Sequence, residues 1–107
     1  MQTIITFGTF DLFHHGHVHL LERAHAVGKK LIVGVSTDQL NFNKKQRYPI
    51  WDQYQRAAAI RNLSFVDEVF FEESLEAKLE YIKHYNASCL VMGHDWQDRF
   101  DYCKKLC

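Results

Sequence analysis

The sequence predicts an α/β fold in which a doubly wound parallel sheet lies between two layers of helices. Short apolar runs of strand length alternate along the 107 residues with segments whose apolar residues recur at helical spacing. Polar and glycine-containing segments follow the first, second and fourth apolar runs, and in a parallel sheet such segments meet beyond the carboxyl ends of the strands. With 47% hydrophobic residues, a chain of this length fits one domain with a single core.

The first strand is predicted over residues 3–7, an apolar run at the start of the chain. A glycine turn follows, and residues 18–28 then have helical periodicity, with Gly28 as the C-terminal stop. One side of this helix is apolar and should pack on the sheet: Leu20, Leu21, Ala24 and Val27.

The second strand is predicted over residues 30–36, whose nearly continuous apolar character is typical of a strand covered on both faces. Residues 38–49 are polar and have no apolar period, so we expect a loop that stays mobile until it binds an anion, acting as a phosphate-facing lid. A second helix is predicted over residues 52–62, with Pro49 before it and Asp52 as its N-cap.

A third strand is predicted over residues 65–71 and a fourth over 89–92, with a helix over 74–82 between them and a last helix over 97–106. Ser74 should lie in the capped first turn of the helix between the strands. Short connections between alternating strands and helices imply right-handed crossovers. The apolar stripe of the 74–82 helix consists of Leu75, Leu79 and Ile82.

The turn over residues 8–17 joins the first strand to the first helix and reads Gly-Thr-Phe-Asp-Leu-Phe-His-His-Gly-His. The first N–H groups of a helix have no intrahelical partner, and the positive end of the helix dipole lies behind them, so this junction favours an anion. His14 and His17 are spaced to share one side of the first helical turn.

These histidines have two other interpretations. In the first, they merely cap an exposed turn. In the second, a metal binds the cluster of His14, His15, His17 and His19, but residues at adjacent and alternate positions of a helix do not converge on one point. We therefore expect no native zinc site here, and we expect His15 and His19 to be solvated.

This turn resembles the signature of the cytidylyltransferase group of nucleotidyltransferases, in which Gly-Thr-Phe-Asp is followed by His-x-Gly-His at the start of a helix. The resemblance covers essentially the whole chain and implies a Rossmann-like fold of three layers, α/β/α, with the HxGH motif at the first strand–helix turn. Further segments match in order and spacing: Ser36-Thr37-Asp38, Arg56, Val66-Asp67-Glu68-Val69 and Val91-Met92-Gly93-His94-Asp95-Trp96.

The resemblance implies transfer of CMP from CTP to a phosphomonoester, with release of pyrophosphate. The members that the chain resembles most use glycerol 3-phosphate and supply cell-wall or capsule synthesis. An acceptor oxygen attacks the α-phosphorus in line, so the protein has mainly to position the reactants and donate hydrogen bonds. Mg²⁺ should arrive largely with CTP, because this ion keeps its waters and uses phosphate oxygens. Another phosphorylated acceptor, ATP in place of CTP, and a non-catalytic nucleotide-binding or dimerisation module are the alternatives.

Site residues follow from the same resemblance. The catalytic groups are His14, His17 and Lys44, and Lys44 also binds the acceptor together with Lys78. The nucleotide-binding residues are Thr9, Phe10, His14, Gly16, His17, Arg56, Gly93 and Asp95.

Some of these assignments have competing interpretations. Lys45 or Arg47 could supply the second cation of the basic loop, and any one of these residues could simply be solvated. Arg56 could bind phosphate or base, or be an exposed helical arginine. Asp11 could hold Mg²⁺ through water, or orient the turn by accepting backbone N–H bonds. Trp96 could lie near the base, although core packing is the commoner role.

Lys plus Arg equals Asp plus Glu at 13 each, so no global field favours nucleic acid or an anionic membrane. No run approaches the roughly 20 apolar residues of a membrane span, and no leader pattern precedes the first strand, so we expect a cytoplasmic protein without membrane insertion. The resemblance implies a homodimer.

The family pattern continues past Cys107 with a further strand and an Arg…Ile-Ser-Thr-Thr segment that binds the triphosphate. Residues 1–107 are therefore expected to form a single nucleotidyltransferase domain that lacks this segment. Ser64 and Leu75 stand where the closest relatives carry Arg and Trp. These differences concern the acceptor more than the reaction class.

Overall fold

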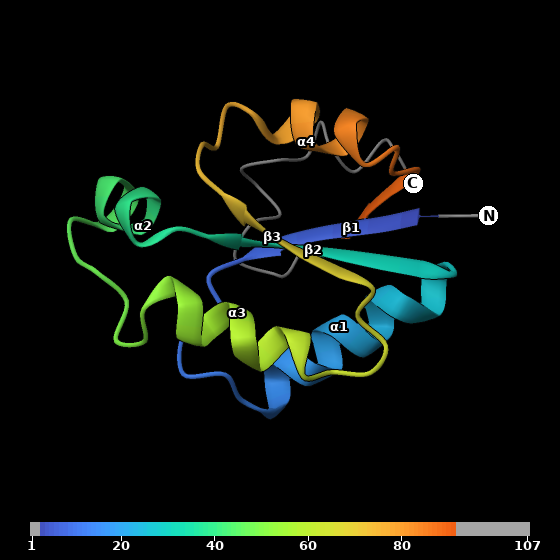
Figure 1. Cartoon of the computed structure of the whole chain (residues 1–107), viewed down its shortest axis with the longest axis horizontal. Helices are drawn as coiled ribbons and strands as arrows, with labels where there is room; N and C mark the ends of the chain where they lie inside the picture. The colour runs from blue at the N-terminus through green and yellow to red at the C-terminus, as the bar shows by residue number, and fades with distance from the viewer. Residues whose placement is uncertain (1–2, 92–107) are drawn as a thin grey trace.

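The computed structural model describes residues 3–91 of the chain, apart from the side chain of Val27. It contains a four-stranded parallel sheet in the order β3-β2-β1-β4. Figure 1 shows α1 and α3 on one face of this sheet and α4 on the other, which confirms the predicted three-layer α/β/α fold. The strands are β1 (Thr3–Gly8), β2 (Lys30–Ser36), β3 (Glu68–Glu72) and β4 (Cys89–Val91); the helices are α1 (His15–Val27), α2 (Asp38–Lys45), α3 (Gln53–Arg61) and α4 (Lys78–His84).

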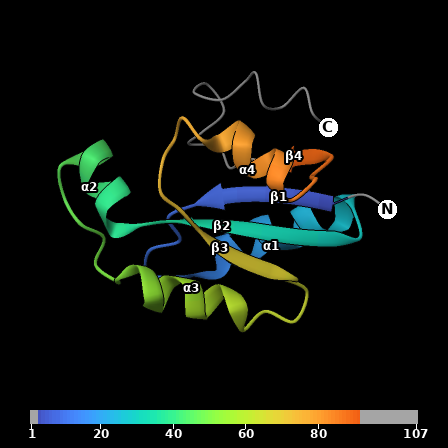
Figure 2. The same cartoon turned by 45° about the horizontal axis from the view of Figure 1, so that its top comes forward.

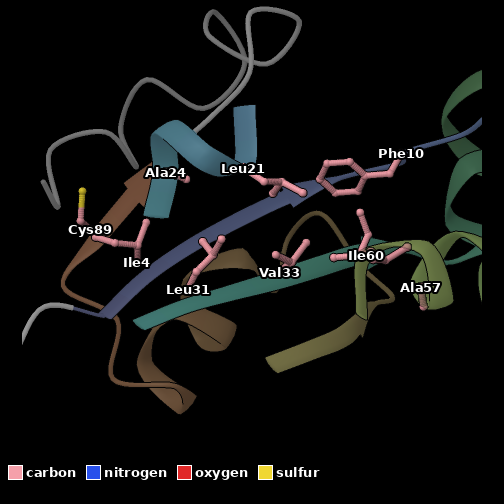
Figure 3. Packing of buried hydrophobic residues seen from close by; sticks show 10 residues of the cluster. Ile4, Phe10, Leu21, Ala24, Leu31, Val33, Ala57, Ile60 and Cys89 are labelled. Atoms are coloured by element: carbon pink, nitrogen blue, oxygen red, sulfur yellow. The ribbon is translucent and has the colours of Figure 1, made fainter. Parts of the chain in front are cut away.

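The core consists of two apolar clusters, one on each face of the sheet, because successive strand residues point to opposite faces. Ile4 packs with the helices α1 and α3, whereas its neighbour Ile5 packs with α4. Figure 3 shows the first cluster, in which Leu21 of α1 and Ile60 of α3 lie over β1 and β2. Strands buried on both faces explain the nearly continuous apolar runs of the sequence.

Helix α2 corrects the prediction of an irregular, mobile loop over residues 38–49. The side chain of Thr37 caps it by accepting from the backbone N–H of Leu40. Leu40 and Asn41 are the buried residues of the helix. One buried apolar side chain produces no periodic pattern, so the sequence gives no sign of this helix. Figure 2 shows α2 beyond the carboxyl end of β2, at the edge where the predicted site lies.

The segment between β3 and β4 also differs from its prediction. Helix α4 begins only at Lys78, and its N-cap, Ala77, makes no side-chain capping bond. The Ser74 hydroxyl instead donates to the carboxylate of Glu76, at 2.8 Å. Of the predicted apolar stripe, Ile82 is buried, but Leu79 is 44% exposed. The predicted helix over 97–106 lies outside the described residues.

Candidate active site

The turn between β1 and α1 is held by the two histidines of the HxGH motif. His14 is the N-cap of α1, with extended backbone, and its Nδ1 accepts from the backbone N–H of Gly16 at 3.0 Å. In return, Nδ1 of His17 accepts from the backbone N–H of His14 at 3.3 Å. Gly16 is required here, because a Cβ at this position would lie 2.9 Å from the His14 ring. The histidines therefore cap the helix reciprocally.

This arrangement fixes which nitrogen of each ring can donate. A nitrogen that accepts a hydrogen bond carries no proton, so in the neutral form each ring holds its proton on Nε2. The two rings stack with centroids 3.8 Å apart. His14 and His17 thus form a pair of N–H donors at a helix N-terminus, where the dipole also favours an anion.

The pKa of His17 lies below its ordinary value. Partial burial is the main cause, and the neighbouring His14 adds to it, whereas Asp11 acts in the opposite direction. Phe10 and Phe13 supply the apolar surroundings, with ring centroids 5.4 and 5.5 Å from that of His17. The lowered pKa favours the neutral ring, which donates through Nε2 without carrying a charge.

Phe10 and Thr9, the predicted nucleotide-site residues of the turn, face inward. The Phe10 side chain is 4% exposed and belongs to the first core cluster. Its φ of 56° is left-handed, an uncommon conformation for a bulky residue. The Thr9 hydroxyl lies 2.9 Å from the side-chain oxygen of Asn41. In this structure, a ligand at the turn would therefore meet backbone groups more than these two side chains.

Asp11 holds the turn against the segment that precedes α3. One carboxylate oxygen accepts from the N–H groups of Leu12 and Trp51, and the other accepts from that of Ile50, at 2.8–3.0 Å. Burial raises the pKa of Asp11, but these backbone bonds and the charge of Arg56 outweigh it and keep the pKa below its ordinary value. With both oxygens engaged, Asp11 fits the orienting role better than that of a metal ligand. Within residues 3–91, no three His, Cys, Asp or Glu side chains form a metal-binding group.

Arg56 is fully buried beneath the turn rather than exposed on its helix. Its guanidinium donates to three backbone carbonyls, those of Thr9, Ser36 and Trp51, at 2.7–3.0 Å. It also forms an ion pair with Asp38 at 2.7 Å. Arg56 therefore joins the HxGH turn, the end of β2 and the start of α2.

Asn41 belongs to the same network, and the sequence analysis missed it. The side-chain amide nitrogen donates to the Ser36 hydroxyl at 2.8 Å and to the Thr37 carbonyl at 2.9 Å, and the residue is 1% exposed. It stands between Leu40 and Phe42 in a segment whose other residues are mostly polar, and nothing in the local pattern distinguishes it from the nearby Asn43. The only signal for a role of Asn41 in the site was its position after the end of the second predicted strand.

Lys44 and Lys78, the predicted acceptor-binding lysines, both lie near Glu72, another residue that the sequence analysis missed. Lys78 is buried, forms an ion pair with Glu72, and lies 4.1 Å from the centroid of the Phe7 ring. Burial raises the pKa of Glu72, while Lys78 and Lys44 act in the opposite direction. The structure brings the two predicted lysines to one carboxylate.

Two hollows lie beside these residues at the carboxyl edge of the sheet. The first, about 200 Å³, is lined by Thr9, Asp11 and Asn41 and by the cations Lys45 and Arg47. The second, about 460 Å³, is lined by Lys44 and by residues 73–76. The predicted basic loop thus divides its charges between the two hollows. The remaining predicted nucleotide contacts, Gly93 and Asp95, and also Trp96, lie outside the described residues.

Comparison with known proteins identifies the relatives of this chain. It is 41% identical to glycerol-3-phosphate cytidylyltransferase of Bacillus subtilis (strain 168), over 100% of this chain and 82% of that protein. It is 38% identical to the protein of the same name from Staphylococcus aureus (strain NCTC 8325 / PS 47), over 100% of this chain and 80% of that one. An FAD synthase of Pyrococcus abyssi (strain GE5 / Orsay) is 38% identical over 96% of this chain and 68% of its own length.

A solved structure confirms the fold. The lipopolysaccharide core biosynthesis protein from Thermoplasma volcanium GSS1 superposes with a TM-score of 0.76 at 27% sequence identity, over 84% of this chain and 72% of that chain. No helix in the described part of the chain is long and apolar enough to cross a membrane. The family described as Cytidylyltransferase-like matches residues 5–106. Together with the HxGH turn and the parallel sheet, these matches establish that the chain belongs to the cytidylyltransferase-like family of nucleotidyltransferases.

Proposed function

We propose that the protein transfers CMP from CTP to glycerol 3-phosphate, giving CDP-glycerol and pyrophosphate for cell-wall or capsule synthesis. The observation that carries the nucleotidyl transfer is the His14/His17 pair, whose two Nε2–H donors lie at the N-terminus of α1. The acceptor is supported by the relatives named glycerol-3-phosphate cytidylyltransferase, which match along the whole chain.

In this reaction an oxygen of the acceptor phosphate attacks the α-phosphorus of CTP, and the bond from phosphorus to the pyrophosphate oxygen breaks. Negative charge grows on the phosphate oxygens, so donors that are fixed beforehand stabilise the transition state. His14 and His17 are fixed in this way, because their Nδ1 atoms are bound to the backbone. No protein nucleophile is needed, and the two imidazoles donate hydrogen bonds without giving up a proton.

The basic residues have separate roles in binding the two substrates. Lys44 receives the acceptor phosphate in the hollow next to residues 73–76, and Lys78, the other predicted acceptor-binding lysine, is paired with Glu72. Lys45 and Arg47 face the other hollow, beside Thr9 and Asp11, and contact the nucleotide phosphates. Arg56 acts as a positioning residue, since its guanidinium holds the Thr9 carbonyl.

CTP enters as its Mg²⁺ complex, in which the metal is bound mainly by phosphate oxygens and water. This assignment agrees with Asp11, whose oxygens are occupied by backbone N–H groups. The location we propose is the cytoplasm, and the active form we propose is the homodimer that the resemblance implies.

The second candidate is the same chemistry with ATP, and it is favoured by the FAD synthase relatives, one of which is 38% identical over 96% of this chain. The residues that bind phosphate serve either nucleotide, because a triphosphate is common to both. Pyrophosphate release with each nucleotide decides between the bases.

The test is pyrophosphate release by the natural full-length protein with Mg²⁺, using CTP or ATP against a panel of phosphomonoesters led by glycerol 3-phosphate. The proposal expects release with CTP and glycerol 3-phosphate, and its loss in His17→Ala. Release only with ATP, or only with a different acceptor, would replace the substrates. No pyrophosphate release with any combination of nucleotide and acceptor, in a protein that still binds CTP, would favour a non-catalytic binding module.

A further inference from the structure

Helix α1 carries a second pair of histidines, His15 and His19, on its solvent face. Both side chains are exposed, and residues four apart on a helix are neighbours on its surface. Their Nε2 atoms lie 2.7 Å apart, and the rings are nearly perpendicular, with centroids 4.3 Å apart. The two rings thus approach each other through their Nε2 atoms.

The expectation that no zinc site forms here concerned the four histidines together, whereas His15 and His19 are four residues apart, a spacing at which two side chains of a helix do meet. We propose that His15 and His19 form a chelating site for a transition-metal dication such as Ni²⁺, Cu²⁺ or Zn²⁺, separate from the nucleotide site. With metal–nitrogen bonds of about 2.0–2.1 Å, two imidazole nitrogens on one ion lie about 2.9 Å apart at a right angle and about 3.3 Å apart at a tetrahedral angle. The observed separation of 2.7 Å needs only a small widening, which rotation of two exposed rings supplies.

The choice of metal follows from the donors. Imidazole nitrogen suits nickel, copper and zinc, whereas Mg²⁺ prefers oxygen and keeps its water. The described residues offer no third ligand from a nearby His, Cys, Asp or Glu, so water completes the coordination. The affinity should follow the general order in which Cu²⁺ exceeds Ni²⁺ and Zn²⁺.

The position of this site gives it a consequence for α1. His15 is the first residue of the helix, and His19 lies one turn further on. A metal that bridges them ties the first turn of the helix together. Because the bridge exists only in the folded helix, bound metal should raise the thermal midpoint of unfolding.

The HxGH histidines are less suited to chelation. The Nδ1 atoms of both His14 and His17 accept backbone N–H bonds, so each ring would have to bind an ion through Nε2. Their rings lie face to face, 23° from parallel. An ion that bound in the plane of one ring would therefore lie out of the plane of the other.

The experiment is titration of the nucleotide-free protein with NiCl₂, followed by calorimetry and by thermal unfolding. The wild type should bind one Ni²⁺ at this site, with a rise in the unfolding midpoint and no competition from excess Mg²⁺. His15→Gln and His19→Gln should each weaken that binding by at least about tenfold, equivalent to about 1.4 kcal/mol of binding free energy, and should remove the thermal shift.

His84→Gln is the matched control, since His84 is also exposed on a helix but its ring contacts only the adjacent Tyr85 among the described aromatic residues. It should bind Ni²⁺ like the wild type. Circular dichroism verifies that each variant is folded. Binding that is unchanged in His15→Gln and His19→Gln, or that is lost in His14→Asn instead, would overturn the proposal. The assay contains no nucleotide, so its result does not depend on the proposed transferase activity.

Discussion

His14 combines two roles that a pair of substitutions can separate. Its Nδ1 caps α1, and its Nε2–H is one of the two donors proposed for the phosphates. Asparagine is among the best N-cap residues, but it has no imidazole, whereas alanine removes both the cap and the donor. The informative experiment therefore compares His14→Ala with His14→Asn.

The expected stability effect is small. Loss of an N-cap costs about 0.5–2 kcal/mol, and the exposed Gly16 N–H can bind water instead, so we expect a value at the lower end for alanine. For a domain of this size, about 1 kcal/mol lowers the unfolding midpoint by roughly 4–8 °C. Asparagine should restore most of this loss.

The expected activity effect is large in both variants. Removing one donor from a developing oxyanion lowers kcat by about 10²–10³, and asparagine does not replace the imidazole. The assays are pyrophosphate release with MgCTP and glycerol 3-phosphate, and urea unfolding followed by circular dichroism. Recovery of activity together with stability in His14→Asn would show that His14 acts only as a helix cap, and it would refute the proposed donor role.

Three further predictions concern the remaining parts of the site. Lys44→Ala should raise the KM for the acceptor about tenfold, as loss of one charge-assisted hydrogen bond implies, with little change for CTP; an unchanged acceptor KM would count against its assignment. Arg56→Lys should lower the free energy of unfolding, measured in urea, by about 2–3 kcal/mol, because lysine cannot reach the same set of acceptors. A raised KM for CTP at normal stability would instead indicate that Arg56 contacts the ligand. The pKa of His17 is lowered on folding, so the unfolded chain binds the proton first as the pH falls below 6.5. The contribution of His17 to stability should therefore be full above pH 6.5 and decline below it. A midpoint for His17 at or above 6.5 in an NMR titration would contradict this.

The sheet and two of its helices could be predicted because their signals are local. Apolar runs covered on both faces mark the strands, and the bounds predicted for β2, residues 30–36, are those observed. The predicted N-cap of α3 is confirmed, since Asp52 accepts from the Gln55 N–H. The α2 helix escaped prediction because tertiary contacts of Leu40 and Asn41 stabilise it, and such contacts leave no period in the sequence.

The same distinction applies to the site. The HxGH turn is contiguous, so the sequence could indicate both the helix N-terminus and the two histidines that lie at it. The arrangement around Arg56 depends on carbonyls from three separate segments, and residue type alone cannot tell a buried guanidinium from a solvated one. Likewise, Glu72 follows an apolar run and resembles an ordinary strand-end carboxylate until the fold places Lys78 against it.

The buried position of Arg56 has a consequence for how the molecule opens. Its acceptors, the carbonyls of Thr9, Ser36 and Trp51, lie 47, 20 and 5 residues away along the chain. Release of any one of these segments would leave a buried cation short of an acceptor, which is costly, so the segments should open together as one cooperative unit. In native-state hydrogen exchange, the protected amides of Asn41 and Trp51 should then exchange with a common opening free energy.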